Sequence, residues 1–579
     1  METSVKYIQP INPTNEERHK MLRIALEEAN HLEDYDNLIE LLSPPKDITS
    51  IEEPGSFKGI KVGIIGGGVA GLSSAFELRK LGFDITIFEL QEKRIGGRIY
   101  THYFDKDKKY YGELGAMRIP VSHETTWHYI NTFGLKTRPF IQNNENAFIY
   151  IRNKRARNDS EGKSVMENIY PEFNLTQRER NTPWQKLIYN ALGSNLLKIE
   201  PSIRKELLQI KKEYSRTIEY LGSLGIRKVL EKMGLSEGAI ELISGIAPFL
   251  GTFYYNSYSE NLLEEYTVDY AYRYEIAGGT INLPLSFYNS LMSKRPKEYS
   301  NIKSENLGKV AWRNGKTVIG IYKDQENNKV TLKYKKEKSS ETFKQTFDFV
   351  ICAIPFSSLR NVEIYPMFST EKMQAIKEVN YTSSQKTAFM CNKRFWEKGN
   401  EKERIIGGGS STDLPIQTIW YPSDNISVNN SPIENENISD GINNNLYNEP
   451  GVLLASYNLN QDAIRLGNLN EKRRIEEIKK QVEAVHGLKL GYLNSVVEES
   501  ITVNWDREKG FYGAFCYFRP EQQKLFSYAM SKSEYNDRVH FAGEHISLIH
   551  GWIEGSVGTG MKAANDIVEY CKIYKKELI

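Results

Sequence analysis

The stretch that decides the fold is IKVGIIGGGVAGLSSAFEL, residues 60–78. Residues 61–65 form a short apolar run, which is typical of a buried strand. A cluster of glycines follows directly, and a helix is predicted over residues 70–80. A second strand is predicted over residues 84–89. The segment is therefore expected to form a β-α-β unit.

Three glycines in this turn, Gly66, Gly68 and Gly71, have the spacing G-x-G-x-x-G of dinucleotide-binding turns. The first permits the tight turn, the second lets the backbone approach a pyrophosphate, and the third lets helix and strand pack closely. Phosphates then lie at a helix N-terminus, where free N–H groups favour anions. Glu89 ends the second strand at the expected distance to bind ribose hydroxyls. These features predict a dinucleotide site, and the acid disfavours a 2′-phosphate.

The bulk composition indicates a folded protein of more than one lobe. The chain has 579 residues, of which 40% are hydrophobic and 26% charged. Its net charge of +2 argues against nucleic acid as the main partner. Its four cysteines are far apart and form no C-x-x-C pair, so neither a disulfide scaffold nor a metal site is expected. No signal-like or membrane-spanning apolar stretch is visible, so a cytoplasmic protein without membrane contact is expected.

The pattern along the chain divides it into stretches of different character. Residues 1–57 are predicted to be a mostly helical, polar extension, in which Pro44 and Pro45 end the helical run. A helical insertion is expected over residues 158–264, and β structure returns over residues 310–354. Residues 423–448 are rich in Asn, Ser, Asp and Glu, which predicts a long loop.

The sequence after the second predicted strand points to the kind of dinucleotide. ELQEKRIGGRIYT, residues 89–101, resembles the pattern E-A-x-x-R-x-G-G-R-x-x-T of flavin amine oxidases, with leucine in place of the usual alanine. In that family this loop wraps FAD. Two phosphates need cationic partners, and the resemblance assigns this task to Arg94 and Arg98.

The C-terminal stretch RVHFAGEHISLIHGWIEGSVGTGMKAA, residues 538–564, is similar to the closing motif of the same family. The resemblance implies a strand, a turn and a helix that enters over the flavin. It places Glu544 against the sugar or ribityl part, and Trp552, Ile553 and Ser556 at the pyrimidine edge. The positive end of the helix would then lie near the part of reduced flavin that carries negative charge.

GELGAMRIP, residues 112–120, resembles the G-A-M-R-I-P motif of L-amino-acid oxidases, and the chain is similar to those of the bacterial type. By this resemblance Arg118 binds the α-carboxylate of the substrate, because its planar fork matches a carboxylate bidentately. The alternative is that Arg118 is a structural ion-pair partner. The matching residues on both sides favour the substrate role.

Three further stretches resemble the same family. STDLPIQTIWYP, residues 411–422, is similar to T-D-L-P-x-R-x-I-Y-Y-P, and it implies that Tyr421 is a second carboxylate donor. SSQKTAFMCNKRFWE, residues 383–397, places Lys386 in register with the family lysine that reaches flavin N5 through a water. AGGTINLP, residues 277–284, resembles the G-G-x-x-x-L-P start of a helix in the FAD domain.

The resemblance implies an α/β fold: a Rossmann-like FAD-binding domain, an interleaved mixed-sheet substrate domain and a helical insertion. The FAD domain is expected from residues 58–100, 265–378 and 530–579, and the substrate domain from residues 101–157 and 379–529. Substrate contacts are expected at Arg118, Tyr421, Gly551 and Trp552, and Lys386 is the expected catalytic residue. Cofactor contacts are expected at Gly66, Gly68, Ala70, Gly71, Glu89, Arg94, Gly97, Arg98, Gly115, Ala116, Met117, Arg118, Val310, Gly543, Glu544, Trp552, Ile553 and Ser556.

The activity implied is FAD-dependent oxidation of an L-amino acid by oxygen, giving the 2-oxo acid, ammonia and hydrogen peroxide. FAD is expected to be non-covalent, since no flavin-linking cysteine motif is present. A flavin monooxygenase that converts the amino acid to an amide shares every motif above. A flavin-bound protein without turnover is the third alternative. A homodimer is possible through residues 1–57.

Overall fold

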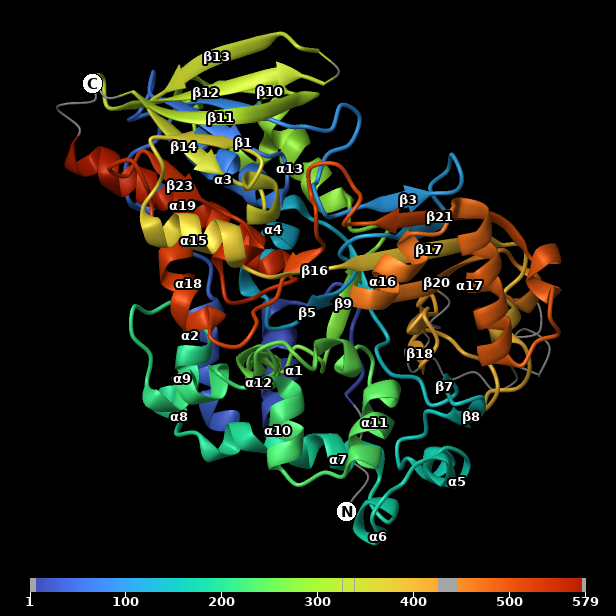
Figure 1. The fold of residues 1–579 in the computed structure, drawn as a ribbon. Helices are drawn as coiled ribbons and strands as arrows, with labels where there is room; N and C mark the ends of the chain where they lie inside the picture. Colours follow the sequence, from blue (N-terminus) through green and yellow to red (C-terminus); the bar gives the residue numbers. More distant parts are fainter. Residues whose placement is uncertain (1–6, 325, 338, 425–445, 575–579) are drawn as a thin grey trace.

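The structure, a computed structural model, describes residues 7–324, 326–337, 339–424 and 446–574. Most of the loop predicted over residues 423–448 lies outside the described residues, as do residues 1–6 of the N-terminal extension. Within the described part, a parallel sheet with its helices, a second large sheet and a cluster of short helices surround a common centre (Figure 1). The predicted α/β class with a Rossmann-like sheet is confirmed.

The first sheet has five parallel strands in the order β10-β2-β1-β14-β23. Every residue of β14 is buried, as expected for a parallel sheet covered on both faces. Chain segments separated by hundreds of residues therefore build one sheet. Its strands are β1 (Lys61–Ile65), β2 (Asp84–Phe88), β10 (Val310–Arg313), β14 (Phe349–Cys352) and β23 (Val539–Phe541).

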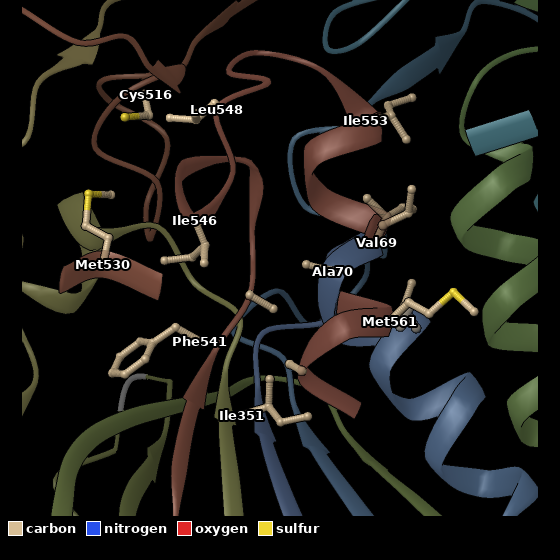
Figure 2. Close-up of a cluster of buried hydrophobic side chains, with 14 of the residues drawn as sticks. Val69, Ala70, Ile351, Cys516, Met530, Phe541, Ile546, Leu548, Ile553 and Met561 are labelled. Atoms are coloured by element: carbon tan, nitrogen blue, oxygen red, sulfur yellow. The ribbon is translucent and has the colours of Figure 1, made fainter. Parts of the chain in front are cut away.

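Two helices that pack on this sheet come from opposite ends of the chain. They are α3 (Val69–Lys80) and α19 (Ile553–Ile573). A Cβ on Gly560 would lie 2.1 Å from Ser73 Oγ, so glycine allows the two helices to come this close. Ser74 Oγ donates to the Gly560 carbonyl at 2.9 Å. Figure 2 shows Val69 and Ala70 of α3 beside Ile553 and Met561 of α19.

A second, four-stranded sheet of order β13-β12-β11-β15 lies next to the parallel sheet at the top of Figure 1. The helices α13, α14, α15 and α18 belong to the same half of the molecule. The elements are β11 (Lys316–Asp324), β12 (Lys329–Lys336), β13 (Thr342–Phe347), β15 (Glu363–Tyr365), α13 (Asn282–Met292), α14 (Phe356–Leu359), α15 (Thr370–Glu378) and α18 (Gln522–Ser531).

The large sheet on the right of Figure 1 has seven strands in the order β21-β17-β20-β19-β18-β7-β8. Lys386 of β17 is directly opposite Tyr457 of β20, so both side chains share one face of the sheet. Its elements are β7 (Phe148–Ile151), β8 (Lys154–Arg157), β17 (Ser384–Cys391), β18 (Gly409–Thr412), β19 (Thr418–Trp420), β20 (Gly451–Leu459), β21 (Val497–Asn504), α16 (Asn460–Gly467) and α17 (Glu471–His486).

Small sheets join these regions. Strand β9 comes from a stretch expected in the FAD domain. It pairs with β5, which is the end of the motif at residues 112–120, and with β6, which follows that motif. This small sheet therefore joins segments that were assigned to the two predicted domains. The elements are β3 (Thr101–Tyr103), β4 (Tyr111–Glu113), β5 (Ile119–Pro120), β6 (Thr137–Pro139), β9 (Arg273–Ile276), β16 (Tyr381–Thr382) and β22 (Phe515–Cys516).

Helices form the lower part of the molecule in Figure 1, in the region of the predicted insertion. The N-terminal α1 packs against the body of its own chain, where Arg18 Nη1 lies 2.7 Å from Glu124 Oε1 of α4. No described helix is long and apolar enough to cross a membrane. Helix α4 (Glu124–Phe133) lies nearer the centre of the view. The lower helices are α1 (Asn15–Glu28), α2 (Tyr35–Leu42), α5 (Lys163–Asn168), α6 (Gln177–Arg180), α7 (Trp184–Ala191), α8 (Pro201–Arg204), α9 (Arg216–Gly222), α10 (Ile226–Lys232), α11 (Glu237–Ile246) and α12 (Tyr258–Thr267).

Candidate active site

One long cavity lies where the parallel sheet, the seven-stranded sheet and the lower helices meet. Its lining extends from the glycine turn after β1 to Lys386 and Tyr457 of the seven-stranded sheet. Most of the predicted site residues line it together, although they come from five separate segments of the chain. They are Gly66, Gly68, Ala70, Glu89, Gly97, Arg98, Gly115, Ala116, Met117, Arg118, Lys386, Gly543, Glu544, Gly551, Trp552, Ile553 and Ser556.

The glycine turn leaves the N-terminus of α3 open to the cavity. Gly66 has φ +103°, a left-handed conformation that favours glycine, and a Cβ there would lie 2.9 Å from the Ala353 carbonyl oxygen. Gly68 is the N-cap of α3, and no side chain caps the helix. The first N–H groups of α3 are therefore free to bind an anion. Gly71 does not line the cavity: a Cβ there would lie 2.1 Å from Gly66 O, so its role is close packing.

Acidic side chains organise the loops around the cavity. Glu89 accepts hydrogen bonds from Gly67 N at 2.8 Å and Gln91 N at 2.7 Å, and burial raises the pKa of its carboxyl. Glu544 pairs with Arg98 at 2.7 Å and accepts from Gly551 N at 3.1 Å. One carboxylate thus orients the turn after β1, and the other links two cavity-lining loops.

The N-terminus of α19 also opens onto the cavity, because Trp552 is its N-cap and no side chain caps the helix. The cavity thus contains two uncapped helix N-termini and an arginine, all of which favour negative charge. This arrangement suits a ligand that carries phosphates in one part and develops a negative charge in another part. These residues fit FAD. Residues 66–70, Glu89 and Arg98 could hold its dinucleotide part, and residues 551–553 could hold its ring system.

Arg118 lies in the cavity without an acidic partner. Its Nη1 donates to Gln142 Oε1 at 3.1 Å, and its guanidinium lies 5.0 Å from the centre of the Trp420 ring and 5.9 Å from that of Trp552. Among the described residues Arg118 forms no ion pair within 4 Å, and Glu264 acts on its charge only from farther away. The structural ion-pair alternative therefore has no partner among these residues, and most of the five donors of Arg118 are available to a ligand.

Lys386 faces the same cavity from β17. Its Nζ donates to Gly115 O at 2.7 Å and lies 4.4 Å from the centre of the Tyr457 ring. Burial and the nearby Arg118 lower the pKa of Lys386 to about 7. Burial raises the pKa of Glu113, beneath it, to about 7. Lys386 is therefore able to hold or release a proton near neutral pH.

The structure places Tyr421 away from this cavity. Its hydroxyl lies 2.7 Å from Ser410 Oγ and 2.8 Å from His486 Nε2, within the core of the seven-stranded sheet. Tyr421 directly follows β19 and points its side chain into that core. This position does not fit the expected role of Tyr421 as a hydrogen-bond donor to the substrate carboxylate. Tyr457, on the strand next to Lys386, lines the cavity in its place.

Two expected cofactor contacts also lie outside the cavity lining. Val310 begins β10 and pairs with Ile85, whereas residues 316–319 of the neighbouring β11 line the cavity. The cavity is therefore lined by the strand that follows the one carrying Val310. Arg94 donates to the Gly97 carbonyl, and its guanidinium lies 4.9 Å from the centre of the Tyr100 ring. It supports the loop that carries Arg98 and does not face the cavity.

Sequence reasoning missed several residues that line the cavity beside Arg118. They are Tyr457, Glu264 and the aromatic residues Phe249, Phe253 and Tyr517. Tyr457 lies in the apolar run of β20 and reads as an ordinary core aromatic. Phe249 has φ +67°, and such strain at a non-glycine residue is not visible in a sequence. Only the fold brings these residues to Arg118.

Comparison with known proteins agrees with this geometry. The family described as flavin containing amine oxidoreductase matches residues 69–568. The L-amino-acid oxidase of Gloydius halys is 30% identical over 546 residues, covering 94% of this chain and 95% of that protein. The L-amino acid oxidase bordonein-L of Crotalus durissus terrificus is 29% identical over 548 residues, covering 94% of this chain and 92% of that protein.

Solved structures show the same fold at low sequence identity. Putrescine oxidase bound to putrescine has a TM-score of 0.64 at 15% identity, covering 88% of this chain and 99% of that one. Cyclohexylamine oxidase from Brevibacterium oxydans has a TM-score of 0.62 at 16% identity, covering 89% and 99%. With the glycine turn, the two open helix ends and the family match over most of its length, this chain belongs to the flavin-containing amine oxidoreductase family.

Proposed function

We propose that this protein is an FAD-dependent L-amino-acid oxidase, which converts an L-amino acid to the 2-oxo acid, ammonia and hydrogen peroxide. The observation that carries this proposal is Arg118, a guanidinium without an acidic partner in the cofactor cavity, beside Lys386 and Trp552. The names of relatives at 29–30% identity over most of their length support it. An amine substrate without a carboxylate would leave the guanidinium of Arg118 without an anionic partner in the cavity.

In this proposal Arg118 binds the substrate carboxylate bidentately, and Gln142 holds the guanidinium from the other side at 3.1 Å. Gly551 and Trp552 form the wall next to the N-terminus of α19. Tyr457, which lines the cavity near Arg118, is placed to contact the same carboxylate. Fixing one end of the substrate in this way orients its α-carbon, and orientation can supply much of a rate enhancement.

When bound, FAD supplies the acceptor for the hydride equivalent of the α-carbon and returns the electrons to oxygen. Lys386 and Trp552 line the same cavity, and Lys386 Nζ donates a hydrogen bond to the Gly115 carbonyl. A pKa of about 7 lets this amine exchange a proton during either half of the cycle. The imino acid that forms is released from Arg118 and hydrolyses to the 2-oxo acid and ammonia.

The test is to mix purified protein with single amino acids in the absence of oxygen and to follow bleaching of the flavin. Oxygen is then admitted, and the 2-oxo acid, ammonia, peroxide and any amide are measured. Bleaching by L- but not D-amino acids, with 2-oxo acid and peroxide in equal amounts, is the expected result. Amide as the main product would indicate a monooxygenase. A flavin that no amino acid bleaches would overturn the proposal.

A further inference from the structure

Glu264 is an acidic side chain in the cavity that the proposed chemistry does not use. It lies on α12 and lines the cavity together with Arg118. No hydrogen bond or ion pair within 4 Å joins its carboxylate to another described residue, whereas the neighbouring Glu260 binds both Phe518 N and His550 Nδ1. A carboxylate held in protein without a partner is costly unless a ligand supplies one.

The walls around Glu264 are aromatic. Phe249 and Tyr457 meet edge to face with ring centres 4.8 Å apart, and Phe253 and Tyr517 lie 4.5 Å apart. All four rings line the cavity. Aromatic faces attract cations as well as apolar chains. An aliphatic chain that ends in a positive charge therefore matches both the walls and the acid.

The positive groups near Glu264 have other tasks. Arg273 Nη1 donates to Gln142 Oε1 at 2.6 Å, and its Nε donates to the Asp269 carbonyl at 2.5 Å; it does not line the cavity. Arg118 is taken by the substrate carboxylate once substrate binds. Burial raises the pKa of Glu264 to about 7, against the opposing influence of these two arginines. A substrate cation beside the carboxyl would stabilise its ionised form.

We propose that Glu264 selects amino acids with a cationic side chain, so that L-lysine, L-arginine or L-ornithine is preferred over neutral amino acids of the same length. Arg118 binds the α-carboxylate, the aromatic rings pack along the methylene groups, and Glu264 binds the terminal cation. This inference rests on the proposed function, because it assumes that Arg118 binds the carboxylate. It names the substrate class for the same cavity.

The test compares L-lysine with L-norleucine, which has the same carbon chain without the terminal amine. Wild-type protein is expected to have the higher kcat/KM for L-lysine. Glu264→Gln should lower kcat/KM for L-lysine about a hundredfold and change that for L-norleucine less than about threefold, as expected when one partner of a buried charge pair is removed. The matched control is Glu265→Gln. Glu265 is the next residue on α12 and its pKa is also raised to about 7, but it lies outside the cavity lining. It should leave the preference unchanged.

Other roles for Glu264 give different outcomes, and each would overturn the inference. A general base for the α-amine would make Glu264→Gln lower kcat for L-lysine and L-norleucine alike. A structural counter-charge for Arg273 would lower the melting temperature and leave the ratio of the two substrates unchanged. A wild-type preference for L-norleucine would contradict the inference directly.

Binding of unreactive probes separates this inference from the proposed function. 6-Aminohexanoate has the carboxylate and the terminal amine of lysine but no α-amine, and hexanoate lacks both amines. Titration calorimetry on the holoprotein should show tighter binding of 6-aminohexanoate, and Glu264→Gln should remove that difference. If no amino acid is oxidised but the difference is present, the proposed function fails and the cation site of Glu264 stands. If amino acids are oxidised and both probes bind equally, the inference fails alone.

Discussion

Replacing Arg118 by methionine tests the centre of the proposed site, because the side chains are similar in length and only the charged fork is lost. One of its five donors binds Gln142, so at least two remain for a substrate carboxylate. Leaving that carboxylate in the cavity without a partner costs about 3–5 kcal/mol. This corresponds to a loss on the order of a hundred to several thousand fold in kcat/KM.

Folding of the variant should be affected much less. The variant loses the hydrogen bond to Gln142 and the contact of the guanidinium with the Trp420 ring, 5.0 Å away. Cation–π contacts of this kind contribute about 0.5–2 kcal/mol. Steady-state kinetics should be measured with an amino acid and with the matching amine that lacks the carboxylate. FAD content and the melting temperature should be close to wild type.

The control is Arg118→Lys, which keeps the charge but cannot bind a carboxylate bidentately, and should recover only part of the activity. The ratio of amino acid to amine is the decisive quantity. If Arg118→Met lowers kcat/KM for both substrates equally, the arginine stabilises the cavity and does not bind the carboxylate. An unchanged kcat/KM for amino acids would remove Arg118 from the site.

The structure leads to three other expected outcomes. Lys386→Met should retain FAD, and amino acid should reduce its flavin at the wild-type rate. Its reduced flavin should react with oxygen about tenfold more slowly, because a group that can carry charge is lost beside the flavin. Equal reoxidation rates of variant and wild type in stopped flow would make Lys386 structural. Burial lowers the pKa of His486 from 6.5 to about 3. Between pH 6.5 and pH 3 the imidazole is therefore protonated in the unfolded chain but not in the folded chain. Acidification from pH 6.5 to about 5 should then cost about 2 kcal/mol of unfolding free energy, and His486→Phe should flatten this dependence in denaturant titrations. Denaturation should release all the flavin, since all four cysteines are buried and free; flavin retained on the chain would contradict this.

The dinucleotide half of the site could be predicted from sequence because its signals are local. The turn at residues 66–71 needs glycine for backbone reasons that hold wherever such a turn occurs, and its strand and helix adjoin it in the chain. The strand predicted over residues 61–65 is β1, with the same bounds. Glu89 lines the cavity as expected, since a β-α-β unit fixes the distance between the ends of its two strands.

The substrate half was predicted less well because its residues meet only through tertiary contacts. The motif at residues 112–120 pointed to Arg118, which the structure places in the cavity. A similar argument for Tyr421 failed, because which face a strand residue presents depends on the sheet that forms around it. The expectation for Val310 failed for a related reason. The β stretch that begins there contains several strands, and more than one of their apolar residues could be the cofactor contact.

By itself the sequence therefore determined the β-α-β unit, the cofactor class and the arginine that binds a carboxylate in the proposed function, since each depends on neighbours in the chain. Tertiary structure alone decided that Lys386 and Tyr457 lie side by side on neighbouring strands, and that Glu264 lines the same cavity as four aromatic rings. The physical reason is that burial and the absence of a partner are properties of the whole fold. A glutamate on a helix becomes a candidate for substrate recognition only when the folded chain leaves its carboxylate without a hydrogen bond or close ion pair.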